Sequence, residues 1–157
     1  MNHNFSIGIL NEENVFWFIY PEKVDFSCNG CAICCKNTEY KVRKILLLKI
    51  EAKKISKKTL IDIDNFSEKI EKYEPYAYEM KKTKDGRCVF LRGNLCRIYK
   101  IRPLICRFYP FKLENLSDNR YRFTYTNECP SIGKGPPLKK AYFKKMFRNF
   151  IHVFRAT

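Results

Sequence analysis

Apolar and polar residues recur with a helical period near the C-terminal end of the chain, over about residues 137–155. The apolar positions are Leu138, Tyr142, Phe143, Met146, Phe147, Phe150, Ile151 and Phe154. Lysine and arginine fill the opposite side, at Lys139, Lys140, Lys144, Lys145 and Arg148. This spacing predicts an amphipathic helix that packs on the rest of the domain. The alternative is a basic amphipathic helix that binds a membrane surface or a partner groove.

Short apolar or alternating segments separated by turn residues predict strands elsewhere in the chain. The predicted strands are residues 15–20, 42–48, 76–82, 88–91, 95–99, 111–116 and 121–126. The last two alternate and are joined at Ser117, Asp118 and Asn119, which predicts a hairpin. Several short strands and hairpins are therefore expected.

Two further helices are predicted between the strands, at residues 48–58 and 65–74. Ile50 and Ile55 are the expected core residues of the first. Asp64 is the expected N-cap of the second, which should end before the next proline. A third helix is expected to hold Cys106, because Pro103 suits a first helical turn.

The composition fits one small folded domain. Hydrophobic residues make up 45% of the 157 residues and aromatic residues 15%, which excludes a disordered chain. We therefore expect a single α+β domain over residues 1–157, with short strands, hairpins and the C-terminal amphipathic helix. The longest apolar run, Val15–Tyr20, is too short for a transmembrane segment, and no secretory signal is visible. A cytoplasmic location is the expectation.

Eight cysteines form two groups of four. The first group is Cys28, Cys31, Cys34 and Cys35, and the second is Cys88, Cys96, Cys106 and Cys129. Reduced cysteines in a cytoplasmic protein serve metals or catalysis more often than disulfides. Four thiolates are what a tetrahedral zinc or an iron–sulfur cluster requires. All eight cysteines are therefore predicted as metal ligands; a disulfide scaffold, accepted inside hyperthermophiles, is the alternative.

The first group contains a compact C-x2-C-x2-C run, which lets three thiolates converge from one loop. Cys34 and Cys35 are adjacent, and neighbouring side chains tend to project apart, so we expect them to serve different sites or one of them to be a structural thiol. The sequence leaves the pairing of cysteines open. The choice of metal is also open between an iron–sulfur cluster and zinc, and the compact run favours an iron–sulfur cluster, with 4Fe–4S as the expected type. Only two histidines are present, which argues against a mixed site.

The cysteine blocks resemble the CxxCxxCC domain family of zinc- or iron-chelating proteins. The matching blocks, in order, are Phe26–Cys35, Cys88–Leu91, Cys96–Tyr99, Arg102–Phe111 and Cys129–Pro130 with Gly133 and Gly135. The resemblance spans about residues 26–135. It implies a metal-binding protein, often described as containing an iron–sulfur cluster.

The same family is similar to part of the flagellin lysine N-methylases. That similarity makes S-adenosylmethionine-dependent methylation of protein lysines a candidate activity, with Tyr99, Arg102 and Arg107 as a possible polar site near the metal. The chain shows no glycine-rich nucleotide loop, and Gly133 and Gly135 are too close together to form one. Methylation is therefore the minority interpretation, and no catalytic residue is assigned.

The chain is strongly basic, with 31 Lys and Arg against 16 Asp and Glu and a net charge of +15. Such a charge attracts anionic partners. Five arginines alternate with aromatic residues around the second cysteine group: Arg87, Arg92, Arg97, Arg102 and Arg107, with Phe90, Tyr99, Phe108 and Tyr109. The main expectation is an iron–sulfur protein with a redox or cluster-support role. The second is a zinc-stabilised module that binds RNA or an acidic protein.

Overall fold

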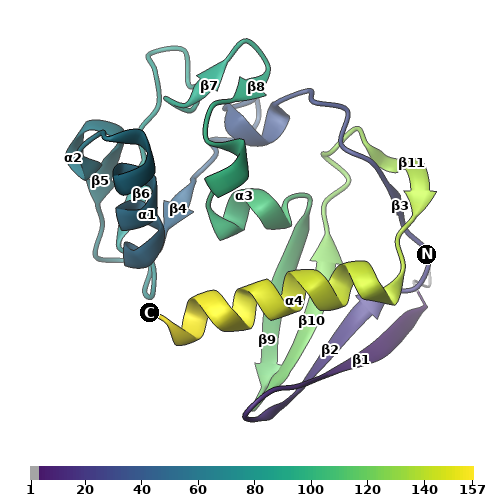
Figure 1. Ribbon diagram of the computed structural model, residues 1–157. Coiled ribbons are helices and arrows are strands. Elements are labelled where there is room, and N and C mark those ends of the chain that lie inside the picture. The colour runs from purple at the N-terminus through teal and green to yellow at the C-terminus, as the bar shows by residue number, and fades with distance from the viewer. Residues whose placement is uncertain (1–3) are drawn as a thin grey trace. The chain divides into compact units, whose positions relative to one another are not determined.

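A computed structural model describes residues 4–157 and shows a mixture of helices and short sheets, which confirms the α+β prediction (Figure 1). The contacts divide the chain into two compact units. The first unit contains the chain up to Asn29 and Phe108–Phe154. The second contains Gly30–Arg107 and Arg155–Thr157. That the whole chain forms a single domain stays a prediction.

The first unit is built on a four-stranded sheet. Its strands are β1 (Phe5–Asn11), β2 (Val15–Pro21), β9 (Phe111–Ser117) and β10 (Arg120–Tyr125), in the order β1-β2-β10-β9. β1 and β2 are antiparallel, as are β9 and β10, and β10 runs parallel to β2. The predicted strand at residues 15–20 and the predicted hairpin are confirmed. β1 was not predicted.

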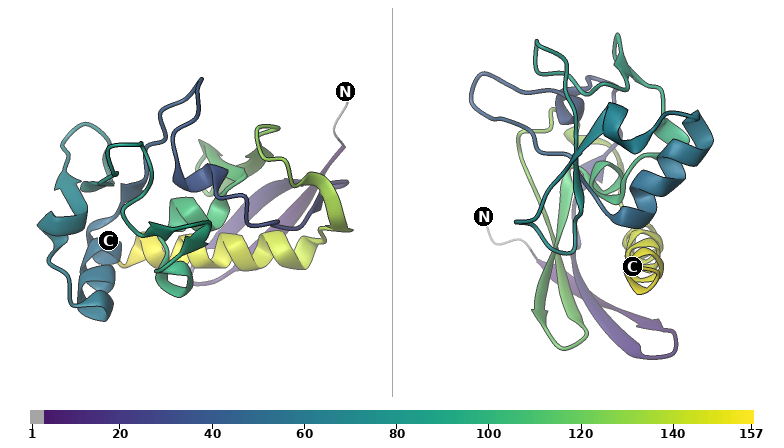
Figure 2. Two further views of the ribbon diagram at one scale, coloured as in Figure 1. Left: turned by 90° about the horizontal axis from the view of Figure 1, so that it is seen from above. Right: turned by 90° about the vertical axis from the view of Figure 1, so that its left-hand side faces the viewer.

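The C-terminal helix α4 (Lys140–Arg155) covers one face of this sheet, as Figure 2 shows in its right-hand view, and its prediction is confirmed. Phe143 and Phe147 of α4 are fully buried against Phe18 of β2 and Phe123 of β10. Four pairs of these rings have centroids 5.1 to 6.5 Å apart, in tilted or edge-on arrangements typical of aromatic cores. Across the described residues, no helix combines the length and the apolar character that spanning a bilayer requires.

A second, two-stranded sheet of the first unit joins β3 (Asp25–Phe26) to β11 (Ile132–Pro137). Phe26 pairs with Ile132 in antiparallel fashion. Neither strand was predicted. This pairing brings the chain around Cys28 beside the chain around Cys129, because each cysteine lies within three residues of a paired position.

The second unit consists of short elements. They are η1 (Ile33–Cys35), β4 (Leu46–Leu47), α1 (Lys49–Thr59), α2 (Ile63–Phe66), β5 (Ser67–Lys69), β6 (Tyr78–Met80), β7 (Leu91–Arg92), β8 (Leu95–Cys96), η2 (Tyr99–Ile101) and α3 (Leu104–Phe108). β4, β6 and β5 form a three-stranded antiparallel sheet in that order. β7 and β8 form a hairpin in which Leu91 faces Cys96. The predicted turn between residues 91 and 95 and the helix that holds Cys106 are confirmed.

Several sequence predictions in this unit are wrong. The strand expected at residues 88–91 does not form, since Val89 and Phe90 lie in a turn and only Leu91 belongs to a strand, β7. The N-cap expected at Asp64 is Asp62, because α2 begins at Ile63.

The helix expected at residues 65–74 ends at Phe66, because Ser67–Lys69 pairs with β6 as a strand. The helix expected at residues 48–58 is present as α1, but Ile50 is 39% exposed. Ala52 and Ile55 face the core instead, because they follow Leu48 at intervals of four and three residues.

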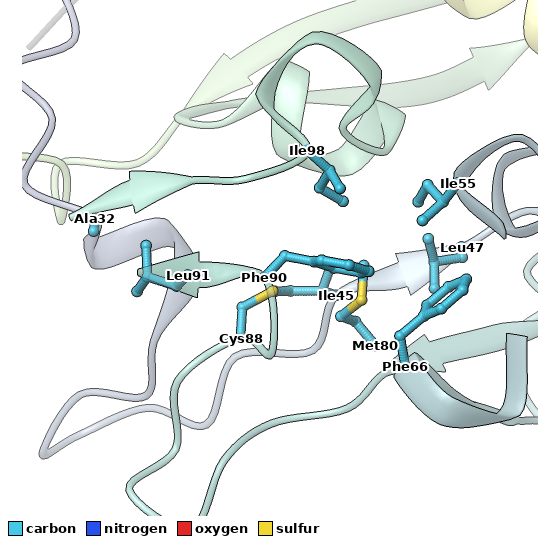
Figure 3. Close-up of a cluster of buried hydrophobic side chains, with 10 residues drawn as sticks. All are labelled: Ala32, Ile45, Leu47, Ile55, Phe66, Met80, Cys88, Phe90, Leu91 and Ile98. Atoms are coloured by element: carbon cyan, nitrogen blue, oxygen red, sulfur yellow. The ribbon is translucent and has the colours of Figure 1, made fainter. Parts of the chain in front are cut away.

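A compact hydrophobic cluster forms the core of the second unit (Figure 3). It contains Ala32, Ile45, Leu47, Ile55, Phe66, Met80, Cys88, Phe90, Leu91 and Ile98. Three further cysteines pack against it while remaining partly buried: Cys35, Cys96 and Cys106. The apolar core and the cysteine side chains therefore occupy one region of this unit.

Candidate metal centre

All eight cysteines carry free thiols, so the structure joins none of them in a disulfide. Six lie in the second unit: Cys31, Cys34, Cys35, Cys88, Cys96 and Cys106. Cys28 and Cys129 belong to the first unit. Most of the candidate ligands for a metal centre thus lie in the second unit.

A tight 3-10 turn places Cys34 and Cys35 side by side. Ala32 starts the turn with φ of 59°, and the N–H of Cys35 donates to the carbonyl of Ala32 at 2.9 Å. The Sγ atoms of Cys34 and Cys35 lie 3.7 Å apart. The two neighbouring side chains therefore do not project apart, contrary to the expectation from sequence, because the 3-10 turn replaces the extended backbone on which that expectation rested.

Backbone pairing brings the second cysteine group to this turn. The N–H of Cys88 donates to the carbonyl of Cys35 at 2.8 Å, and Lys36 pairs with Arg87 as an isolated bridge. Cys96 follows on β8, in the hairpin that begins three residues after Cys88. The third member, Cys106, lies on α3, whose first turn includes an N–H to carbonyl bond from Cys106 to Pro103 at 3.0 Å.

Five thiols influence one another electrostatically, which shows that they share one neighbourhood. The charge of Cys34 raises the pKa of Cys35, Cys88, Cys96 and Cys106. For the last three of these, burial is the largest cause of the raised pKa. For Cys35 the largest cause is the hydrogen bond that it donates to Cys34. These five thiols are called the thiol cluster below.

Cys34 is the exception, because its pKa falls to about 7. The hydrogen bond from Cys35 is the largest cause, and the guanidinium groups of Arg43 and Arg102 add a smaller attraction. Arg43 is itself buried, with 9% exposure. Sequence analysis did not identify Arg43, because nothing in its spacing relates it to the cysteines.

Two backbone amides point at cysteine sulfurs. The N–H of Phe90 donates to the sulfur of Cys88, and the N–H of Ile98 donates to the sulfur of Cys96. Each bond opposes part of the rise that burial causes in the pKa of its thiol. Each amide lies two residues after its cysteine. Such N–H to sulfur bonds stabilise thiolates and are a feature of sulfur-ligated metal sites.

Glu51 is a further site-supporting residue that sequence analysis missed. Its Oε1 accepts from the N–H of Leu104 at 2.6 Å and its Oε2 from the N–H of Leu48 at 2.9 Å. The carboxylate therefore links the start of α1 to the start of α3, which carries Cys106. The available signal was its place in the first turn of a helix, where a glutamate accepts backbone N–H groups.

Tyr99, Arg102 and Arg107, predicted as a polar site near the metal, lie close to one another, and the arginines donate to backbone carbonyls. Arg102 stacks over the Tyr99 ring at 3.8 Å and donates to the Tyr99 carbonyl at 2.8 Å. Arg107 donates to the carbonyls of Arg102 and Lys100. These arginines thus fix the chain between Cys96 and Cys106.

The remaining cysteines are placed differently. Cys28 is exposed and Cys129 buried, on the two segments next to the β3–β11 pair, where the N–H of Asn29 donates to Ser131 Oγ at 3.3 Å. Cys31 is partly buried, three residues before Cys34. The prediction that Cys28, Cys31 and Cys129 are metal ligands stays a prediction.

The donors of the thiol cluster suit a soft metal in type, since all are sulfur and histidine is absent from the group. Their arrangement is looser than a closed site: over residues 4–157, no three cysteine, histidine, aspartate or glutamate side chains are arranged to hold a metal ion. The structure therefore gathers the thiols into one region without closing them around a single point.

Comparison with known proteins points the same way. A family described as "CxxCxxCC: Putative zinc- or iron-chelating domain" matches residues 27–130, which is most of the chain and confirms the resemblance noted in the sequence. The description supports a metal-binding protein.

Two uncharacterized proteins of Methanocaldococcus jannaschii are similar to this chain. One is 26% identical over 128 residues, 74% of this chain and 61% of the relative. The other is 27% identical over 130 residues, 79% of this chain and 43% of the relative. The chain thus spans about half the length of these relatives. No solved structure matches it at a significant level.

Proposed function

The chain belongs to the CxxCxxCC family, and we propose that its second unit binds an iron–sulfur cluster through thiols of the thiol cluster. The packing of the thiols carries this proposal: Cys88 belongs to the hydrophobic cluster of the second unit, and Cys35, Cys96 and Cys106 pack against that same cluster from three other parts of the chain. A 4Fe–4S cluster takes one thiolate at each iron. Four of the five thiols of the thiol cluster would supply these ligands.

The surroundings would also offset the negative charge of such a group. Arg43 and Arg102 lie close enough to lower the pKa of Cys34, and the amides of Phe90 and Ile98 bind two of the sulfurs. An iron–sulfur cluster supplies one-electron transfer when bound. We therefore propose a redox or cluster-support role, in the cytoplasm, where thiols stay reduced.

Zinc is the second candidate, and one distance favours it. Sulfurs bound to the same tetrahedral zinc stand about 3.8 Å apart, given zinc–sulfur bonds of about 2.3 Å. The Sγ atoms of Cys34 and Cys35 are 3.7 Å apart. A zinc site that includes both adjacent cysteines would make the second unit a metal-stabilised module, and the basic charge of the chain would then suit an RNA or acidic-protein partner.

Methyl transfer to lysine has less support. Arg102 and Arg107 donate to backbone carbonyls, so these groups stabilise the local fold. The relatives are longer than this chain, so the methylase interpretation would also depend on residues that this chain does not share with them.

Purification without oxygen, followed by iron, sulfide and zinc analysis and an absorption spectrum, tests the proposal. We expect a brown protein with iron and sulfide in equal amounts and absorbance near about 400 nm. Cys88→Ser and Cys106→Ser should each lose the cluster. The same substitution at Cys129 separately tests the prediction that this thiol of the first unit is a ligand. A colourless wild-type protein with one zinc per chain would refute the cluster and support the second candidate.

A further inference from the structure

A cavity of about 260 Å³ opens in the second unit, and no cysteine is among the residues that line it. Its walls come from the end of α1, from α2 and from the chain around the β7–β8 hairpin. The lining residues are Thr59, Ile61, Asn65, Phe66, Val89, Phe90, Arg92, Arg97 and Ile98. No carboxylate is among them. This volume lies just below the usual range for small-molecule pockets.

The floor of the cavity is apolar and rigid. Phe66, Phe90 and Ile98 are buried members of the hydrophobic cluster, with 2%, 6% and 4% exposure (Figure 3). The rings of Phe66 and Phe90 pack against each other with centroids 5.4 Å apart. A flat apolar group would find a preformed surface here.

The hairpin places two arginines at the rim. Leu91 faces Cys96 and Arg92 faces Leu95, and the N–H of Arg97 donates to the carbonyl of Phe90 at 2.9 Å. Within the hairpin, Arg92 lies on the side opposite Leu91 and Cys96, because side chains alternate along a strand. Arg92, Arg97 and Phe90 all line the cavity.

Within the described part of the chain, no acidic side chain neutralises the positive charge at this rim. Arg92 makes only long contacts, 3.4 Å, to the carbonyls of Val89 and Leu91. Neither Arg92 nor Arg97 forms an ion pair with any acidic side chain in residues 4–157. Two guanidinium groups over an apolar floor, with Thr59 and Asn65 as further polar groups, match an anion that carries an apolar body.

We propose that this cavity binds a small organic anion, with a phosphate or carboxylate held by Arg92 and Arg97 and an apolar group resting on Phe66 and Phe90. The volume limits the ligand to about one ring and its anionic group. The residues that carry the proposal are not metal ligands, so it holds for a zinc protein and an iron–sulfur protein alike.

The cavity shares residues with the surroundings of the thiol cluster. Phe90 and Ile98 place their side chains in its floor, while their backbone amides bind the sulfurs of Cys88 and Cys96. A bound ligand would therefore press on the two residues that position these amides. This gives the anion a direct route to influence the metal centre.

Calorimetric titration of the purified, metal-loaded protein with four probes tests the proposal. Phenyl phosphate and benzoate carry both required groups, inorganic phosphate lacks the apolar group, and benzyl alcohol lacks the charge. We expect saturable binding of phenyl phosphate or benzoate, with the other two probes at least about tenfold weaker. The stronger of the two anions identifies the head group.

Variants locate the site. Arg92→Gln and Arg97→Gln should each weaken binding roughly tenfold, and Ile61→Glu, which adds a negative charge at the exposed rim, should abolish it. Arg120→Gln, which removes the same charge from the first unit, should change nothing. Metal content and circular dichroism equal to wild type ensure that each variant is folded. Equal binding by the Arg92, Arg97 and Arg120 variants, or no saturable binding of either organic anion, would overturn the proposal.

Discussion

Glu51 offers a sharp test of how the second unit supports its cysteines. Its two oxygens accept the N–H groups of Leu48 and Leu104 at 2.9 and 2.6 Å, and the side chain is mostly buried. Glu51→Ala would leave both N–H groups without this partner. An N–H group that loses its partner in a largely buried place costs about 1–3 kcal/mol. We expect a loss of about 2 kcal/mol in the free energy of unfolding.

Urea unfolding followed by far-ultraviolet circular dichroism measures this loss. With a slope of about 2 kcal/mol per molar urea, the midpoint should fall by about 1 M. Glu71→Ala, which removes an exposed carboxylate from the same unit, is the matched control and should shift the midpoint little. A Glu51→Ala midpoint equal to that of the control would refute the role assigned to this carboxylate.

The pH dependence gives a second readout of the same residue. Burial raises the pKa of the Glu51 carboxyl above its ordinary value, so the folded protein binds this proton more tightly than the unfolded chain. The protonated form is therefore favoured by folding, and its contribution to stability is lost as pH rises from about 4.3 through the raised pKa. Relative to Glu51→Gln, which cannot titrate, the wild type should lose stability across this window. A difference that grows in favour of the wild type as pH rises would contradict the assignment.

Three further substitutions probe packing and loop structure, each by urea unfolding. Phe147→Ala should cost about 3–5 kcal/mol, because the ring is fully buried in the aromatic core of the first unit. Gly8→Ala should cost at least about 1–3 kcal/mol, because the added Cβ would lie 2.1 Å from the Phe18 ring; a variant as stable as wild type would refute that contact. Asn37→Ala should cost about 1–2 kcal/mol, because Oδ1 accepts the N–H of Arg43 at 2.9 Å, and unchanged stability would show this loop to be held otherwise.

The sequence was sufficient to predict a helix or strand where its pattern of apolar residues was long or regular. α4 and the β9–β10 hairpin follow from their apolar periods, and the packing of Phe143 and Phe147 agrees with them. β1 was missed because one of its inward positions is Gly8, which has no side chain to show a pattern. The ring of Phe18, from the next strand, fills that place.

The helix expected at residues 65–74 failed for a different reason. Phe66, Ile70 and Tyr73 stand at helical intervals, but Ser67 pairs with Met80 and the N–H of Ile70 donates to the carbonyl of Ala77. Pairing with a distant segment thus overrode a local period, which no inspection of this segment alone would reveal.

The candidate site was predictable in kind but not in arrangement. The cysteine count and spacing indicated sulfur ligation, and the family match supports metal binding. The contact between Cys34 and Cys35 depends on the left-handed backbone of Ala32, a conformation that sequence analysis would assign to glycine. Glu51 and Arg43 reach the site through the fold, so their roles became visible only in three dimensions.

The discontinuous make-up of the first unit has a consequence for how the chain matures. During synthesis, Gly30–Arg107 leaves the ribosome while the first unit is still no more than β1, β2 and β3. The second unit can then fold, and bind the metal proposed for it, before α4 has been synthesised. Once the second unit is folded, the segment between Asn29 and Phe108 is no longer a flexible loop. Less conformational entropy of the chain is then lost when β2 pairs with β10. If the second unit binds metal as proposed, a shortage of metal would delay formation of the four-stranded sheet of the first unit, although that sheet contains no member of the thiol cluster.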